Sequence, residues 1–340
     1  MQFVCKNCFA DKELKGFILS QNTIGDCHCC ESKGVEIIVF EELLDFFKEL
    51  FENFQPTNGG ERFISKIQGN WSLFSSIECG QRILNFALDK INSPISNSDD
   101  LVDFNEEILE NVNFWFKLKE QLKWERRYLT DINYLTDDLG WDGFFESKTV
   151  INKGDIFYRA RLHKNADEKI FPNEEMYCPK RELSTAGRAN PSGIPYLYLS
   201  DNESTILYEI RASYLDEVSV ASFCLNQGLI QDIIISDFTE APALYAPNEV
   251  NRRIKSTLLK QVIRRDLSKP MRRYDSELDY IPTQFICEFI KVFTNVQGIK
   301  FRSSLHKIGN NLVIFNQDIM ECKGVKKIQV SKVSIGSKEI

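Results

Sequence analysis

The sequence predicts an α+β protein in which a small metal-binding knuckle and a helical region precede a mixed sheet with flanking helices. Three observations lead to this prediction. Two Cys-x2-Cys pairs lie within the first 30 residues, apolar residues recur at helical spacing between 41 and 129, and strand-like runs replace that pattern after residue 150. We therefore expect a zinc-ribbon-like knuckle at 1–35, a helical domain at 36–147 and an α+β domain at 150–330.

The knuckle contains two Cys-x2-Cys pairs separated by 18 residues, formed by Cys5, Cys8, Cys27 and Cys30. Four thiolates in this pattern surround one tetrahedral Zn²⁺ with little backbone strain, and a closed four-ligand site leaves no position for a substrate. We predict one structural zinc ion, because so short a segment hardly folds without a metal. Two alternatives remain open: free thiols in a small reduced core, and Cys29 as a ligand in place of a neighbour.

The next segment is predicted to be helical, with a Ser/Asn/Asp-rich loop at Ser93–Asp100. Its apolar and aromatic stripes are typical of core packing, and we assign no cofactor to them. The expected helices are Glu41–Phe54, Arg62–Phe74, Gln81–Ile91 and Asp103–Leu129.

The second half changes to short strands that alternate with helices. The expected strands are Asp155–Leu162, Tyr196–Leu199, Val218–Cys224, Asp232–Asp237, Gly298–Phe301, Leu312–Phe315 and Lys327–Val333. The expected helices are Ser204–Ala212, with Ser204 as the favoured N-cap, Asn248–Asp266 and Thr283–Phe293.

Composition excludes several classes of protein. The 340 residues suit about two domains, and 43% hydrophobic residues suffice for their cores. No apolar run approaches the roughly 20 residues that span a bilayer, and the N-terminus resembles neither a signal nor a transit peptide. Five of the ten cysteines crowd the first 30 residues, which suits a metal site better than a disulfide framework. We expect a cytoplasmic protein that does not bind membranes.

Charge differs between the two halves. Residues 1–150 hold 15 Lys and Arg against 26 Asp and Glu, a net charge of −11, and the remainder carries +4. An acidic first half disfavours nonspecific nucleic-acid binding, whereas a mildly basic second half suits a small molecule that bears phosphate. We therefore expect a nucleotide as the ligand and not a nucleic acid.

Polar residues are concentrated in strand-like runs of the second half. The run Phe157–Arg161 carries two arginines, the Gly/Pro-rich turn Gly187–Pro195 carries Arg188, and Glu209 follows on a predicted helix. A Gly/Pro turn lets the backbone approach a bound molecule closely. This combination indicates a site for an anionic ligand.

These residues resemble the RES domain, which occurs in bacterial toxins that destroy cellular NAD in toxin–antitoxin systems. The family's first Arg, in a Tyr-Arg-Ala strand, matches Arg159, and its Gly-Arg-x-Asn-Pro-x-Gly turn matches 187–193 with Arg188 as the second Arg. Its strand tyrosine matches Tyr198 and its helical Glu matches Glu209.

The last elements of the resemblance follow a Gly-Ile-x-aromatic-x segment, where the family's Ser matches Ser303, although a slip of one residue would exchange it with Ser304. A Gly-Asn-Asn segment at Gly309–Phe315 then closes the domain as it does in the family. The resemblance covers roughly residues 150–330 and implies a fold similar to the ADP-ribosyltransferases.

The resemblance also implies roles for these residues. Cleavage of the nicotinamide–ribose bond of NAD develops a ribosyl cation, which Glu209 would stabilise. The planar guanidinium groups of Arg159 and Arg188 would bind the pyrophosphate of NAD or an incoming inorganic phosphate. The catalytic residues are then Glu209, Arg159 and Ser303, and the NAD-binding residues are Arg188, Tyr198, Tyr158 and Asn190.

Simpler interpretations compete with these roles. Glu209 in a solvated helix would pair with Arg211 or Arg252, and Arg159 in a strand would form a structural ion pair. The same alternation that places Tyr198 on one strand face places Tyr196 beside it, so that one of the two belongs to the core.

We interpret the sequence as an enzyme that consumes NAD by hydrolysis or phosphorolysis, with zinc in a structural role only. The alternatives are transfer of ADP-ribose to a protein or nucleic acid, and a degenerate site in a sensor or binding module. The knuckle and helices resemble a HEPN-like RES-associated domain, but no histidine lies between 40 and 147, which excludes an Arg-x4-6-His RNase motif there. We expect this domain to serve oligomerisation or sensing, with a homo-oligomer and an antitoxin protein as partners.

Overall fold

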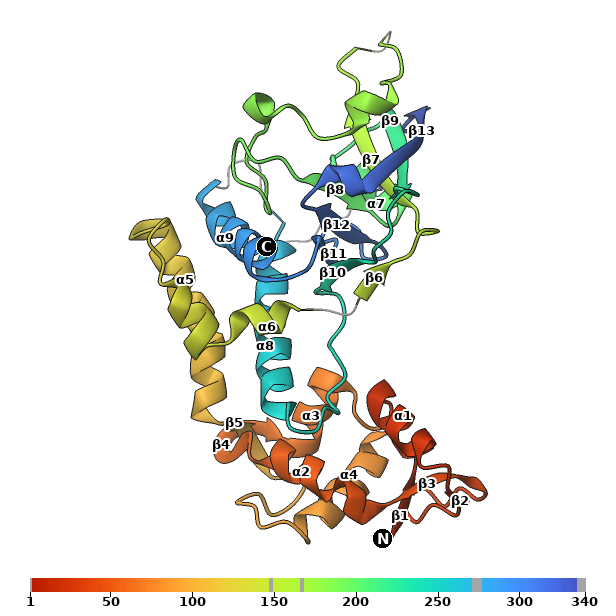
Figure 1. Cartoon of the computed structure of the whole chain (residues 1–340), viewed down its shortest axis with the longest axis vertical. Coiled ribbons are helices and arrows are strands. Elements are labelled where there is room, and N and C mark those ends of the chain that lie inside the picture. The colour runs from red at the N-terminus through yellow and green to blue at the C-terminus, as the bar shows by residue number, and fades with distance from the viewer. Residues whose placement is uncertain (1, 147–148, 166–167, 271–276, 335–340) are drawn as a thin grey trace. The chain divides into compact units, whose positions relative to one another are not determined.

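The computed structural model describes residues 2–146, 149–165, 168–270 and 277–334 (Figure 1). The chain divides into two compact units, one made of residues 1–116 and 241–259 and the other of 117–240 and 260–340. The border between them falls within two helices, α5 (Glu106–Trp124) and α8 (Val250–Leu267). None of the described helices is both long and apolar enough to cross a membrane.

The first unit begins with a three-stranded antiparallel sheet in the order β1-β3-β2, which holds the two Cys-x2-Cys turns. Its strands are β1 (Phe3–Cys5), β2 (Ile24–Gly25) and β3 (Val35–Val39). Helix α1 (Lys12–Ser20) lies between the two turns in the sequence, and its N-cap Asp11 accepts a hydrogen bond from the backbone of Leu14. The short 3₁₀ helix η1 (Lys6–Cys8) carries the first turn.

Helices follow where the sequence predicts them, although their ends differ. They are α2 (Leu44–Phe51), α3 (Phe63–Trp71), α4 (Ile77–Leu88) and α5, and a 3₁₀ turn, η2 (Phe40–Leu43), precedes α2. The predicted helix ends at Phe54 and Asp103 are wrong, because both residues belong to an antiparallel two-stranded sheet of β4 (Phe54–Arg62) and β5 (Leu101–Phe104), which α3 and α4 separate in the sequence. The ladder is interrupted between Pro56 and Glu61, and this irregular, Gly-containing strand gives no alternating signal in the sequence.

Residues 241–259 belong to the first unit through specific polar contacts. The Asp11 carboxylate accepts the backbone N–H of Leu244 at 2.7 Å, and the Glu49 carboxylate accepts that of Val250 at 2.7 Å. The indole Nε1 of Trp71 donates to the Thr257 hydroxyl at 3.1 Å. These partners lie more than 180 residues apart in the sequence, so the segment depends on the N-terminal part of the chain for its packing.

We therefore predict that a fragment starting at Thr149 does not fold properly. Removing residues 1–148 takes away Asp11, Glu49 and Trp71, and it leaves the apolar residues Leu244 and Val250, which are fully buried in the whole chain, without a core. We expect the fragment to be insoluble, or to unfold at least 10 °C below the full chain, since about 1 kcal/mol shifts Tm by roughly 2–4 °C at this size. A soluble fragment with an unchanged melting temperature would contradict this dependence.

The second unit contains a mixed eight-stranded sheet in the order β13-β9-β7-β8-β12-β11-β10-β6, which confirms the predicted α+β class. Only the pair β10–β11 is parallel among the described strands. The strands are β6 (Thr149–Ile151), β7 (Phe157–Leu162), β8 (Leu197–Ser200), β9 (Glu217–Leu225), β10 (Ile233–Asp237), β11 (Gly298–Arg302), β12 (Asn310–Ile314) and β13 (Met320–Gln329).

Helices α7 (Glu203–Glu209), α8 and α9 (Ile281–Phe293) accompany this sheet, with a short helix α6 (Trp141–Phe145) before it. A π-helical turn, η3 (Tyr134–Asp138), and four 3₁₀ turns complete the unit: η4 (Asn173–Met176), η5 (Arg181–Leu183), η6 (Glu277–Tyr280) and η7 (Gln317–Ile319). The predicted strand Lys327–Val333 is placed too late, because β13 begins at Met320 and pairs with β9 through a bulge near Gly324.

Alternation along β7 divides its residues between the two faces of the sheet. Phe157 packs into the main apolar core of this unit, whereas Tyr158 and Ala160 pack with Ile206 of α7 in a smaller cluster. Helix α7 therefore lies over the strand face that presents Tyr158 and Ala160. Arg159 shares the opposite strand face with Phe157.

Candidate functional site

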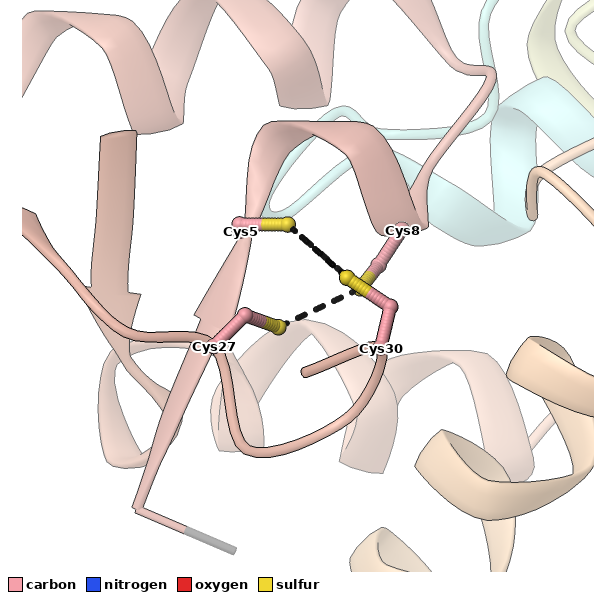
Figure 2. Close-up of side chains that lie close together, drawn as sticks. All are labelled: Cys5, Cys8, Cys27 and Cys30. Carbon is pink, nitrogen blue, oxygen red and sulfur yellow. Dashed lines mark hydrogen bonds between the residues drawn. The ribbon is translucent and has the colours of Figure 1, made fainter. Parts of the chain in front are cut away.

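The four predicted cysteine ligands converge in the first unit (Figure 2). The Sγ atoms of Cys5 and Cys8 lie 3.7 Å apart, those of Cys5 and Cys30 3.5 Å, and those of Cys8 and Cys27 3.5 Å. A tetrahedral zinc site with Zn–S bonds of about 2.3 Å has its sulfur atoms about 3.8 Å apart. These distances fit one tetrahedral cation, and they are far too long for disulfides of about 2 Å.

Burial and hydrogen bonding also suit a metal at this position. Cys5, Cys8 and Cys27 are buried, and only Cys30 is exposed. Hydrogen bonds from Cys5 and then Cys8 lower the pKa of Cys27, and the same contacts with Cys27 raise the pKa of Cys5 and of Cys8. The cluster can therefore hold a metal ion with no vacant position for a substrate.

His28 and Cys29, the two residues between the ligands of the second turn, are engaged elsewhere. The Nδ1 atom of His28 accepts backbone N–H groups of Gln2 and Phe3. The Sγ atom of Cys29 lies 3.4 Å from that of Cys79, a cysteine of α4 that the sequence analysis did not connect with the knuckle. Cys29 therefore has a different partner and does not replace one of the four ligands.

In the second unit, α7 and the loop between β11 and β12 bring Glu209 and Ser303 into direct contact. The Ser303 hydroxyl donates to Glu209 Oε1 at 2.6 Å, and Asn311 Nδ2 donates to the same oxygen at 2.8 Å. Ser303 and Asn311 are buried and Glu209 is half-buried. Both of these donors are neutral, and within the described part of the chain Glu209 forms no ion pair with Arg211 or Arg252.

The same contact distinguishes Ser303 from its neighbour. Ser304 is exposed, whereas the Ser303 hydroxyl also accepts the backbone N–H groups of Leu305 and His306. Asn311 was not singled out by the sequence analysis, although it lies in the Gly-Asn-Asn segment quoted there. Since Asn311 pairs with Ser200 and Ser200 with Tyr158 across the sheet, these three residues share one face.

Close packing fixes the loop against α7. His306 Nδ1 lies 2.7 Å from the Thr205 hydroxyl, and its ring stacks on Tyr208 with centroids 4.8 Å apart. Gly309 has no room for a side chain, because a Cβ there would lie 2.0 Å from the Thr205 hydroxyl oxygen. The helix itself is capped by Asn202, whose side chain accepts the backbone N–H of Thr205, and not by Ser204 as predicted.

Tyr198 and Asn190 hold the predicted Gly/Pro turn in place. The Tyr198 hydroxyl donates to Asn190 Oδ1 at 2.8 Å and accepts the backbone N–H of Ala189 at 3.0 Å. Asn190 Nδ2 donates to the carbonyl oxygen of Pro191 within the turn and to that of Thr185 just before it. Burial raises the pKa of Tyr198, so its hydroxyl stays protonated and can donate. Tyr196 is also buried, against Phe315.

Arg159 is a half-buried cation, and only some of its donor atoms have hydrogen-bond partners among the described residues. Its Nη1 donates to the carbonyl oxygen of Tyr198 at 3.2 Å, and its fully buried Nε has no hydrogen-bond partner among the described residues. Burial lowers the pKa of Arg159, although a guanidinium remains charged. No carboxylate in the described part of the chain pairs with Arg159, which argues against a structural ion pair.

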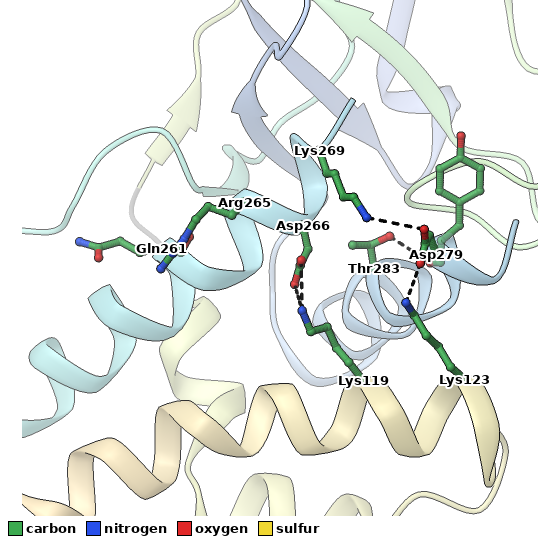
Figure 3. Close-up of polar contacts among 9 residues, drawn as sticks. Lys119, Lys123, Gln261, Arg265, Asp266, Lys269, Asp279 and Thr283 are labelled. Atoms are coloured by element: carbon green, nitrogen blue, oxygen red, sulfur yellow. Dashed lines mark hydrogen bonds and ion pairs between the residues drawn. The ribbon is translucent and has the colours of Figure 1, made fainter. Parts of the chain in front are cut away.

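Arg188 lies in a pocket of about 90 Å³. Its Nη1 donates to the carbonyl oxygen of Leu267 at the end of α8, at 2.7 Å, and the Thr283 hydroxyl donates to the Arg188 carbonyl oxygen. The pocket also contains three lysines and two aspartates, whose pairs are shown in Figure 3: Lys119 with Asp266 at 2.9 Å, and Lys123 and Lys269 with Asp279 at 2.6 and 3.6 Å.

The structure thus groups the predicted residues in part. Glu209 and Ser303 are joined, and Tyr198 links Asn190 to Arg159 through its hydroxyl and its carbonyl oxygen. No described hydrogen bond or ion pair connects either arginine to Glu209. The lysines around Arg188 were missed because they come from α5 and from the end of α8, which no local motif connects with residue 188.

Comparison with protein families supports the identity of this second unit. The family described as "RES domain" matches residues 156–334, which is more than half of the chain. Searches of curated proteins and of solved structures gave no significant match. Such a domain is consistent with an NAD-related protein associated with toxin–antitoxin systems. Strands β7 to β13 and the Glu209–Ser303 contact all lie inside this range. The chain belongs to the RES domain family.

Proposed function

We propose that this protein cleaves the nicotinamide–ribose bond of NAD, with water or inorganic phosphate as the acceptor. The observation that carries the proposal is the Glu209 carboxylate, which accepts hydrogen bonds from Ser303 and Asn311 and forms no ion pair with any residue that the structure describes. The RES family membership supports the choice of NAD as the substrate. The proposal is tested by incubating the purified full chain with NAD and measuring the release of nicotinamide.

Glu209 acts in this mechanism by electrostatic stabilisation. Departure of nicotinamide leaves positive charge on the ribose, and a fixed carboxylate lowers the energy of that state. Both donors bind Oε1, so they orient the carboxylate while Oε2 remains able to face the ribose or an incoming oxygen. Nicotinamide is cationic in NAD and leaves as a neutral molecule, so no general acid is required.

In this proposal Arg159 and Arg188 bind the phosphate groups of NAD or an incoming inorganic phosphate. The Nε atom of Arg159 has no hydrogen-bond partner within the described part of the chain, and a guanidinium offers bidentate hydrogen bonds to phosphate oxygens. Arg188 lies among other cations, which suits a pyrophosphate or an inorganic phosphate. Tyr198 and Asn190 fix the turn that carries Arg188, and Tyr158 shapes the face beneath α7. These are positioning roles, because the polar atoms of Tyr198 and Asn190 are already bonded within the chain.

A second candidate function is transfer of ADP-ribose to a protein or nucleic acid, which uses the same ribosyl cation with a different acceptor. The hydrogen bond from Ser303 to Glu209 favours both of these activities, NAD cleavage and ADP-ribose transfer, over a degenerate binding module. We further propose that the division at 1–35, 36–147 and 150–330 corresponds to functional segments. The first two segments would carry the zinc and the contacts for a homo-oligomer or an antitoxin, within the cytoplasm.

We predict that Arg159→Lys raises KM for NAD by about tenfold or more while the fold is retained. Lysine keeps the charge but loses the planar fork that binds phosphate, and a lost charged hydrogen bond is worth about 1.5–3 kcal/mol. Arg161→Lys is the matched control on the same strand, because Arg161 bonds the Glu175 carbonyl and stacks on Phe171. Equal KM values for Arg159→Lys and the parent protein would assign Arg159 a structural role.

A further inference from the structure

Two buried cysteines outside the sequence-predicted ligand set, Cys29 and Cys79, form a second thiol group together with Cys8. Cys8 comes from the first Cys-x2-Cys turn, Cys29 from the second, and Cys79 from the first turn of α4, and their Sγ atoms all lie within 4.8 Å of one another. Cys29 and Cys79 are 3.4 Å apart at their sulfur atoms, and all three side chains are at most 8% exposed. Cys8 belongs to both groups.

We propose that Cys8, Cys29 and Cys79 form a site for a second thiophilic cation, with Cys8 as a thiolate that bridges it to the zinc in the first site. Soft thiolate ligands select Zn²⁺ and Cu⁺ among the biological metals. Three thiolates satisfy a trigonal Cu⁺, or they leave Zn²⁺ one position for an outside ligand. The proposal is independent of NAD cleavage, because the group lies entirely within the first unit.

Charge supports a second cation. One Zn²⁺ with four thiolates carries a formal charge of −2, and two Zn²⁺ with six thiolates carry the same charge. A second Zn²⁺ therefore displaces the protons of Cys29 and Cys79 without adding net negative charge to a buried region. The guanidinium of Arg82, one turn along α4, donates to the Cys29 carbonyl at 2.9 Å and adds a positive charge beside the thiolates.

Local structure also holds the trio together. The Ser76 hydroxyl caps α4 by accepting the backbone N–H of Cys79 at 3.1 Å, and the Cys79 thiol lies 3.5 Å from the Cys8 carbonyl oxygen. The three sulfur atoms are therefore brought together by the start of a helix and by the two Cys-x2-Cys turns, which a cation in the first site would already hold in place. A site of this kind requires little rearrangement on binding.

The test is the metal content of the full chain after saturation with Zn²⁺ or Cd²⁺ and removal of loosely bound ions, measured by native mass spectrometry. We expect two ions in the parent protein and one in Cys79→Ser and in Cys29→Ser. Cys224→Ser, which removes a buried thiol from the second unit, is the matched control and should keep two. The ultraviolet thiolate-to-Cd²⁺ band should lose about a third of its intensity in the variant that lacks both Cys29 and Cys79.

A parent protein that saturates at one ion would overturn the proposal, and so would a Cys79→Ser variant that still binds two. If Cys79→Ser fails to fold, the number of ions bound by the parent protein is by itself the test of the proposal. Native mass spectrometry of its Cd²⁺ form then distinguishes two ions with six displaced thiol protons from one ion with four.

Discussion

Glu209→Gln is expected to lower the rate of NAD cleavage by about 10²–10³, the usual effect of removing one well-placed electrostatic stabiliser. Glutamine has nearly the same shape and can still accept hydrogen bonds from Ser303 and Asn311. It lacks the negative charge that meets the ribosyl cation. We therefore expect kcat to fall while the melting temperature and the affinity for NAD change little. The measurement is the initial rate of NAD consumption under saturating substrate.

Glu203→Gln is the matched control for this variant, because Glu203 lies on the same helix and pairs with Lys326 at the surface. Such an exposed pair contributes about 0–1 kcal/mol to stability, so the control should retain the parent rate. If Glu209→Gln keeps more than about a tenth of the parent rate, the proposed role of Glu209 is wrong.

Replacement of Cys8 by serine is expected to remove the bound metal and unfold the N-terminal part of the first unit. Binding of structural zinc contributes about 10–16 kcal/mol to the folding of small zinc domains. Cys8 is fully buried at the centre of both thiol groups, so serine in its place leaves a ligand set that cannot close around the cation. Elemental analysis and thermal unfolding of the purified variant measure both effects.

Cys224→Ser again provides the comparison, since the Cys224 thiol donates to the Leu225 carbonyl and a serine hydroxyl can do the same. We expect that control to retain its metal and its melting temperature within a few degrees. A Cys8→Ser protein with a full complement of zinc, or with an unchanged melting temperature, would show that the cluster is not a structural metal centre.

Short, local patterns made the site partly predictable from the sequence. Glu209 and Ser303 were found because each lies in a recognisable segment, and their contact across 94 residues agrees with that choice. Asn311 could have been predicted, because strand alternation places it on the same face of the sheet as Val313 and Tyr198. The choice between Ser303 and Ser304 required the structure of the loop, because residues in turns do not alternate regularly between two faces.

Features that depend on tertiary packing could not be predicted in this way. Cys79 joins the knuckle from a helix that begins about 50 residues after Cys29, and no spacing rule connects them. The surroundings of Arg188 depend on where α8 ends, at Leu267. The strand pair β4–β5 was not predicted because its first strand contains Pro56 and two glycines, residues that are rare inside strands.

The most direct test of the account is the product analysis of NAD incubated with the purified full chain, with and without inorganic phosphate. Mass spectrometry should show nicotinamide in both reactions, together with ADP-ribose in water or with phosphorylated ADP-ribose when phosphate is the acceptor. The same incubation with Glu209→Gln should leave NAD nearly unchanged. Intact NAD after prolonged incubation with folded, zinc-loaded parent protein, under both conditions, would contradict the proposed activity.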